Sequence, residues 1–149
     1  MKVVFFSLSL LFLIACGDNK NGSATADDGP KTQTDSLLQE VLDSHDIVMP
    51  KMKKLERQMK ASQAAVDSLN QLPAGKQNVA LKVKMQALYT DLSNADKAMN
   101  EWMSGFQYDS LKNDEAARIK YLQDQKAKVN EVKNQVLSTI EKADSILEK

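Results

Sequence analysis

The sequence predicts an all-α protein, specifically an antiparallel three-helix bundle with coiled-coil-like heptad seams. After residue 33 the chain consists largely of Ala, Leu, Lys, Gln, Glu, Asp and Met, which is the composition of long helices. Apolar residues recur there at alternating spacings of three and four, the pattern that packs one helix against another. Short connections separate the periodic stretches, so consecutive helices should be antiparallel neighbours.

The first fifteen residues have the pattern of an export signal. Lys2 supplies a positive charge, and an almost unbroken apolar run extends from Val3 to Ile14. This run is shorter than the roughly 20 residues that a membrane-spanning helix needs. It ends in Leu13-Ile14-Ala15-Cys16, which resembles the lipobox of bacterial lipoproteins. We therefore expect residues 1–15 to be a signal peptide that is removed.

The resemblance to a lipobox implies that Cys16 carries a diacylglycerol group and an acylated amino terminus. Two or three acyl chains anchor a protein stably, so the predicted partner at this end is a membrane. Cys16 is the only cysteine of the chain, which agrees with a role in lipidation. The expected location is the bacterial cell envelope, at the outer membrane or the periplasmic face rather than the inner membrane. An ordinary signal with a chance cysteine, or an uncleaved short anchor, is the alternative.

Residues 16–34 are predicted to form the lipidated cysteine and a flexible tether, and residues 35–149 the bundle. The segment from Gly17 to Gln33 has almost no apolar side chain and cannot offset the entropy of ordering.

The first helix is expected from Ser36 to Gln71, with Asp35 or Ser36 as its cap. Pro50 should kink it or break it near Met49. Its predicted seam consists of Leu38, Val41, His45, Val48, Met52, Leu55, Met59, Ser62, Val66 and Leu69.

The second helix is expected from Lys76 to Ser104, after a turn at residues 72–75 and before a stop at Gly105. Its predicted seam consists of Leu81, Met85, Leu88, Leu92, Ala95, Met99, Trp102 and Phe106.

The third helix is expected from Asn113 to Leu147, with acidic residues in its first turn where the helix dipole favours them. Its apolar stripe drifts, and Lys126 and Lys133 dilute it, so we expect this helix to pack less tightly or to splay. The stripe consists of Ile119, Leu122, Val129, Val132, Val136, Ile140, Ala143 and Leu147.

The turn between the first two helices places a candidate site near one end of the bundle. Residues equidistant from the turn lie level, so His45 should face Met103, and Met49 should face Met99, beside Trp102. Thioethers and imidazole are ligands for soft ions such as Cu(I) or Ag(I), and an indole can add a cation–π contact.

Core packing explains the same residues without any ligand. Methionine commonly fills gaps in helical cores, and tryptophan fills the end of a bundle well. His45 could equally bind a neighbouring carboxylate, Asp43 or Asp46. A single histidine without a nearby cysteine excludes the usual zinc ligand set. Both interpretations remain open from the sequence.

The chain lacks the features of most functional classes. No catalytic triad, phosphate loop or second histidine is present, so we expect no enzymatic activity and no cofactor. The 20 basic and 20 acidic residues balance, which argues against a nucleic-acid partner. Pairs such as Glu56 with Lys60 and Asp124 with Lys128 suit a solvated face or the border of a groove.

The leading interpretation is a lipid-anchored protein that binds or scaffolds a protein partner or a second copy of itself. A soft-metal binder or sensor, and a small helical envelope chaperone, are the alternatives.

Two segments resemble a known group of proteins. They are the run from His45 to Met52 (HDIVMPKM) and the run from Asn100 to Phe106 (NEWMSGF). With the lipobox, they are similar to small Bacteroidetes lipoproteins that are often labelled "viral A-type inclusion protein". The resemblance implies an exported helical protein without an established activity, so it assigns no role to any residue.

The lipobox yields a direct prediction. Incorporation of radiolabelled palmitate into the protein should disappear in Cys16→Ala, because the thioether cannot form without the thiol. Gel fluorography of labelled cells measures this, with the wild-type chain as the reference. Label that persists in the variant would contradict the lipobox assignment.

Overall fold

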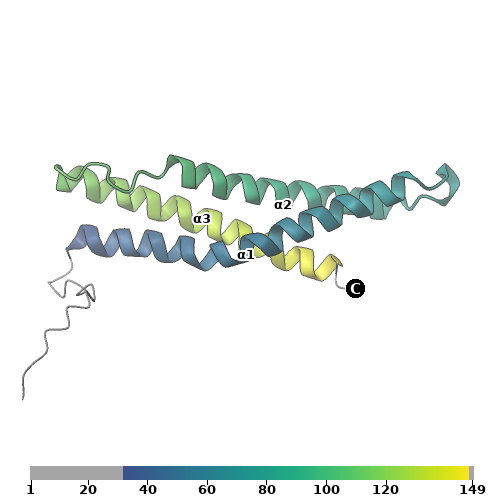
Figure 1. Cartoon of the computed structure of the whole chain (residues 1–149), viewed down its shortest axis with the longest axis horizontal. Coiled ribbons are helices and arrows are strands. Elements are labelled where there is room, and N and C mark those ends of the chain that lie inside the picture. Colours follow the sequence, from purple (N-terminus) through teal and green to yellow (C-terminus); the bar gives the residue numbers. More distant parts are fainter. Residues whose placement is uncertain (1–31, 148–149) are drawn as a thin grey trace, which may run out of the picture.

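The structure is a computed structural model that describes residues 32–147. Three long helices account for most of this part: α1 (Gln33–Asn70), α2 (Val79–Gly105) and α3 (Glu115–Leu147). A short 3-10 turn, η1 (Ala74–Lys76), lies between α1 and α2. Consecutive helices run antiparallel, so α1 and α3 point in the same direction (Figure 1). Each helix packs against the other two. The predicted all-α three-helix bundle is confirmed, and the described residues contain no strand.

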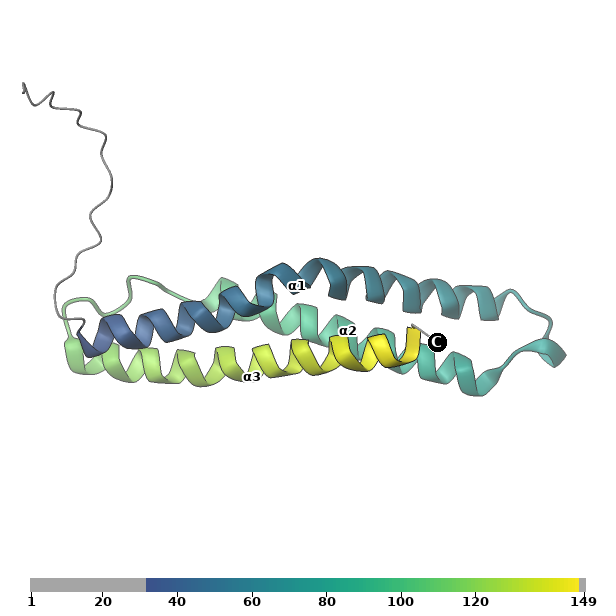
Figure 2. The same ribbon diagram turned by 90° about the horizontal axis from the view of Figure 1, so that it is seen from below.

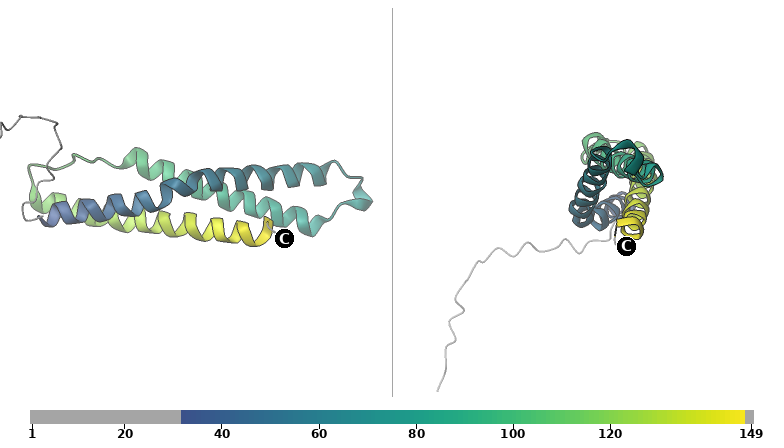
Figure 3. Two further views of the ribbon diagram at one scale, coloured as in Figure 1. Left: turned by 60° about the horizontal axis from the view of Figure 1, so that its bottom comes forward. Right: turned by 90° about the vertical axis from the view of Figure 1, so that its right-hand side faces the viewer.

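The three helices are staggered along the bundle axis. The connection between α1 and α2 projects beyond the last turn of α3 (Figure 2). At the opposite end, the starts of α1 and α3 lie close together, beside the segment that connects α2 to α3 (Figure 3). Each end of the molecule is therefore built from a different pair of helices.

The start of α1 differs from the sequence prediction, whereas its middle shows one of the two outcomes expected at Pro50. Thr32 is the cap: its hydroxyl accepts a hydrogen bond from the backbone N–H of Asp35, whose carboxylate accepts one from the backbone N–H of Thr32. The helix thus begins three residues before the predicted start, at Gln33. Pro50 lies inside α1 and does not break it. The ribbon changes direction near its middle, a bend expected where proline removes a hydrogen bond (Figure 1).

A side-chain cap sets the start of α2. The side chain of Asn78 accepts a hydrogen bond from the backbone N–H of Leu81, so α2 begins at Val79 rather than at Lys76. The helix includes Gly105, one residue beyond the predicted end at Ser104, and the backbone N–H of Phe106 still reaches the carbonyl of Trp102 at 2.9 Å.

A buried arginine holds the connection between α2 and α3 in place. Asp114 caps α3 by accepting a hydrogen bond from the backbone N–H of Ala117 at 3.0 Å. One turn later, Arg118 is 9% exposed and donates to the carbonyl oxygens of Ser110 at 2.6 Å and Tyr108 at 3.3 Å. The charge of Arg118 is thus compensated by backbone carbonyls that would otherwise lack partners.

The core is one continuous row of side chains along the bundle axis, and it matches most of the predicted seam positions. Residues of all three helices contribute, and several have no exposed surface. The cluster consists of Val41, Val48, Leu55, Leu88, Leu92, Ala95, Met99, Trp102, Val129, Val136, Ile140 and Ala143.

The expectation that α3 splays is wrong. The interface between α3 and α1 is more extensive than the interface between α2 and α1. Polar residues complete its stripe where the apolar positions are missing: Gln125 and Thr139 are 7% and 8% exposed. The stripe is therefore regular, and the drift disappears once buried polar side chains are included in it.

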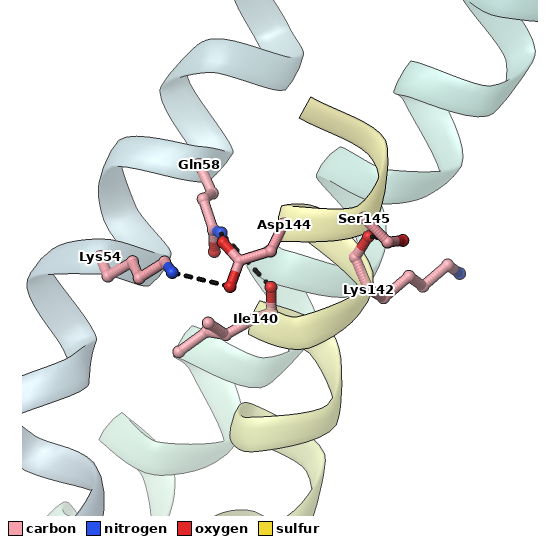
Figure 4. A network of polar contacts seen from close by, with 6 residues as sticks. All are labelled: Lys54, Gln58, Ile140, Lys142, Asp144 and Ser145. Carbon is pink, nitrogen blue, oxygen red and sulfur yellow. Dashed lines mark hydrogen bonds and ion pairs between the residues drawn. The ribbon is translucent and has the colours of Figure 1, made fainter. Parts of the chain in front are cut away.

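Polar contacts inside the bundle fix the register of α3 against α1. Asp144 accepts hydrogen bonds from Lys54 at 2.7 Å and from the amide nitrogen of Gln58 at 2.6 Å (Figure 4). The same nitrogen of Gln58 lies 3.3 Å from the carbonyl oxygen of Ile140. A shift of α3 by one turn would separate all these groups while they remained partly buried, at a cost in unfolding free energy.

The two charge pairs expected on the surface have different outcomes. Lys60 lies 2.6 Å from Glu56 and lowers the pKa of that carboxyl by hydrogen bonding and by its charge. Asp124 and Lys128 form no ion pair in the described structure. Exposed pairs of this kind contribute little to stability.

Replacement of Leu88 by alanine should lower the free energy of unfolding by roughly 2–5 kcal/mol, because its side chain has no exposed surface and the change leaves a cavity. Leu81→Ala is the matched control in the same helix. Leu81 is 38% exposed, so this variant should lose much less unfolding free energy than Leu88→Ala. Urea unfolding followed by circular dichroism measures both variants. Equal losses in the two would contradict the observed register of α2.

Candidate functional site

The aromatic residues near the end of α2 form a column that is centred on Trp102. The Trp102 ring stacks on Phe106 with centroids 5.2 Å apart and an interplanar angle of 18°. The ring of His45 approaches it from α1 at 5.7 Å. Phe106 stacks in turn on Tyr121 of α3 at 6.3 Å. Three helices thus contribute to one column of rings, which stabilises their relative positions at this level.

A hydrogen bond to α3 holds the indole of Trp102 in place. Its Nε1–H donates to the side-chain oxygen of Gln125 at 3.2 Å. Trp102 is only 8% exposed and Gln125 only 7%, so the bond is shielded from water. Sequence reasoning missed Gln125. The spacing of seven positions between the apolar residues Leu122 and Val129 indicated it, because core positions of a packed helix recur every three or four residues. One more buried residue is therefore expected between them.

His45 lies at the edge of the core and not within it. Its neighbours Ser44 and Val48 are the buried residues of this part of α1, whereas the His45 side chain is 23% exposed. Its Nδ1–H donates to the carboxylate of Asp46 at 2.9 Å, one of the two acidic partners that the sequence suggested. The imidazole ring also contacts the ring of Trp102, with an interplanar angle of 39°.

A small hollow opens beside this column, between α1 and the end of α2. It has a volume of about 260 Å³ and is lined by Leu42, His45, Trp102, Met103 and Phe106. Among the side chains that line this hollow, His45 carries an imidazole and Met103 a thioether; the others are hydrocarbon apart from the indole N–H of Trp102, which is bonded to Gln125. The predicted register, which placed His45 level with Met103, agrees with this hollow.

The structure separates the predicted ligand set into three environments. His45, Trp102 and Met103 line the hollow. Met99 has no exposed surface and belongs to the core, and Met49 is 38% exposed and does not line the hollow. Cys16 lies outside the described residues. Within residues 32–147, no cluster of three or more His, Cys, Asp or Glu side chains could hold a metal ion.

A second hollow of about 380 Å³ lies on the other side of Trp102, between α2 and α3. Trp102 and Gln125 line it together with Glu101, Lys128 and Glu131. The indole therefore separates an apolar hollow from a charged one. Its burial and its hydrogen bond hold this partition in place.

Comparisons with known proteins add no further constraint on the site. No protein family, curated protein or solved structure matches the chain. Across the part that the structure describes, no helix is long and apolar enough to cross a membrane.

The bond between Trp102 and Gln125 can be measured with a double-mutant cycle. Gln125→Leu leaves the buried indole N–H without an acceptor and should lower the free energy of unfolding by about 1–3 kcal/mol. In the double variant with Trp102→Phe, no polar group is left unpaired, so its loss should be smaller than the sum of the single losses. Gln123→Leu, at an exposed position of α3, is the control. Strict additivity would mean that the bond does not form.

Proposed function

We propose that this chain is a lipid-anchored protein of the bacterial cell envelope, tethered through Cys16, that acts as a non-catalytic binding or scaffolding bundle. The lipobox at residues 13–16 supports the anchor. The first helix begins only at Gln33, so a stretch with almost no apolar side chains separates the lipidated residue from the bundle.

The observation that carries the binding function is the apolar hollow beside Trp102. Aromatic side chains at the wall of a pocket are frequent anchors of protein interfaces. The hollow, about 260 Å³, lies below the usual range of small-molecule pockets, which is roughly 300–1,000 Å³. It suits an apolar side chain that a protein partner inserts, with Trp102 and Phe106 as its walls. A chaperone for unfolded clients would need a longer apolar groove than this hollow provides.

A soft-metal site is the second candidate, and the shared lining of His45 and Met103 favours it. These two residues supply one imidazole nitrogen and one thioether, the ligand types that Cu(I) prefers. Met99 is enclosed in the core and Met49 does not line the hollow, so the predicted set of four ligands is incomplete. The apolar character of the remaining wall favours the protein partner over the metal ion.

Photocrosslinking in living cells tests the binding function. A benzophenone side chain in place of Met103, at the wall of the hollow, should form an adduct with one discrete protein. The matched position is Asn94 on the exposed surface of the same helix, which should yield no such adduct. A second change, Leu42→Trp, fills the hollow and should abolish most of the adduct from position 103.

Two outcomes would contradict the binding function. One is equal crosslinking from positions 94 and 103, which would show that contacts are not specific to the hollow. The other is a shift of the emission of Trp102, the only tryptophan, at stoichiometric Cu(I), with loss of that shift in Met103→Leu. That result would assign the hollow to a soft metal instead.

A further inference from the structure

The hairpin between α1 and α2 ends in a surface that exposes large apolar side chains. We call residues 71–84 the tip; they comprise the cap of α1, the connection with η1, and the first turns of α2. Leu72 is 41% exposed, Val79 64%, Leu81 38% and Val83 59%. Val79 and Val83 are one turn apart in α2 and so lie on the same face. Half of the large hydrophobic residues that the described structure exposes are gathered here.

The tip is also strongly basic, although the chain as a whole is neutral. Lys76, Lys82 and Lys84 lie within it, and no acidic residue occurs between Asp67 and Asp91. None of these three lysines forms an ion pair with any residue from 32 to 147. Elsewhere on the bundle some lysines, such as Lys54 and Lys142, pair with acidic side chains and others do not. The tip differs from the rest of the bundle because no acidic residue lies within it. The balanced overall composition therefore concealed a local excess of positive charge.

The stagger of the helices leaves this surface free. The tip projects beyond the last turn of α3 and lies at the end of the molecule opposite the start of α1 (Figure 2). Two hydrogen bonds close the turn. The backbone N–H of Lys76 donates to the carbonyl of Pro73 at 2.7 Å, and the side-chain amide of Gln77 donates to the carbonyl of Leu72 at 2.7 Å. These bonds order the loop, so its exposed side chains can bind without a large loss of backbone entropy.

We propose that the tip docks onto an anionic lipid surface. Apolar side chains that enter the headgroup region gain by leaving water, and lysines beside them are attracted to negatively charged lipids. Leu72, Val79 and Val83 supply the first contribution and the three lysines the second. Insertion would be shallow, since the tip is a turn between two helices and neither of them can cross a membrane.

The charge and composition of the tip favour an anionic lipid surface over a second copy of the chain or a nucleic acid. Two copies of the tip would each carry three unpaired positive charges and would repel one another, which disfavours a dimer through this surface. Sites for single-stranded nucleic acid combine basic residues with aromatic rings that stack on bases, and sites that read duplex sequence frequently use arginine. The tip has no aromatic ring and no arginine, and its exposed valines and leucines would gain nothing from a phosphate backbone.

This inference does not depend on the anchor at Cys16. If the proposed function is also correct, the lipid is joined through the tether to the start of α1, which lies at the end of the bundle opposite the tip. Helix α1, with 38 residues, is about 57 Å long at 1.5 Å per residue. The bundle would then connect the membrane that holds its lipid to a second anionic lipid surface.

Vesicle cosedimentation of residues 16–149 with Cys16→Ala tests the tip without an attached lipid and without the apolar run of residues 3–14. The vesicles contain phosphatidylcholine alone or phosphatidylcholine mixed with the anionic lipid phosphatidylglycerol. This parent chain should bind the anionic vesicles more tightly than the neutral ones. Lys76→Gln, Lys82→Gln and Lys84→Gln together should weaken this binding roughly a hundredfold, since each lysine near an anionic surface contributes about a factor of five.

The matched control removes three exposed lysines from the shaft of the bundle: Lys51→Gln, Lys53→Gln and Lys120→Gln. It has the same net charge as the tip variant and should bind like the parent chain. A second tip variant, Val79→Ser with Val83→Ser, should weaken binding on the order of tenfold and retain this effect in high salt, where the contribution of the lysines is screened.

Three outcomes would overturn the proposal. Equal weakening by the tip and shaft variants would show that only net charge matters. Binding that is the same on neutral and anionic vesicles for every variant would place the contact outside the tip. Tighter binding of the parent chain to duplex DNA than to the anionic vesicles, with the same sensitivity to the tip lysines, would assign the tip to nucleic acid.

Discussion

Burial of one apolar stripe from each helix along a common axis is the constraint on which the rest of the structure depends. The core residues Val48, Leu55, Leu92 and Val136 have no exposed surface, and together with their neighbours they form one continuous cluster. No disulfide can assist, because the single cysteine precedes the bundle. Without a covalent cross-link, the bundle depends on this packing, and Val48 and Leu55 stay buried on either side of the bend at Pro50.

Polar residues inside the bundle decide which of the many similar packings is adopted. Apolar stripes tolerate a shift by one turn, because one leucine or valine can replace another. Buried groups with directional partners do not tolerate it. Asp144 with Gln58 aligns α3 on α1, and Gln125 with Trp102 aligns α3 on α2. The contact between Gln125 and Trp102 also positions Trp102 as the wall of both hollows.

The stagger of the helices gives the two ends of the rod different chemistry. Toward the start of α1, three helices supply a column of aromatic rings and an apolar hollow. At the other end, α3 stops short and the hairpin of α1 and α2 exposes valines, leucines and unpaired lysines. A scaffold needs separate surfaces held at a defined distance, and a rigid bundle with unlike ends provides them.

The amino-acid sequence by itself determined the helical class, the number of long helices, most core positions of α1 and α2, and the proximity of His45, Trp102 and Met103. These follow from periodicity and from the position of one turn, which are local properties. Only the tertiary structure decided that Gln125 and Thr139 belong to the core, that Met49 and Met99 do not share a hollow with His45, and that the tip extends beyond α3. The physical reason is that burial of a polar side chain, and the exposure of an apolar one, depend on where another helix lies or ends.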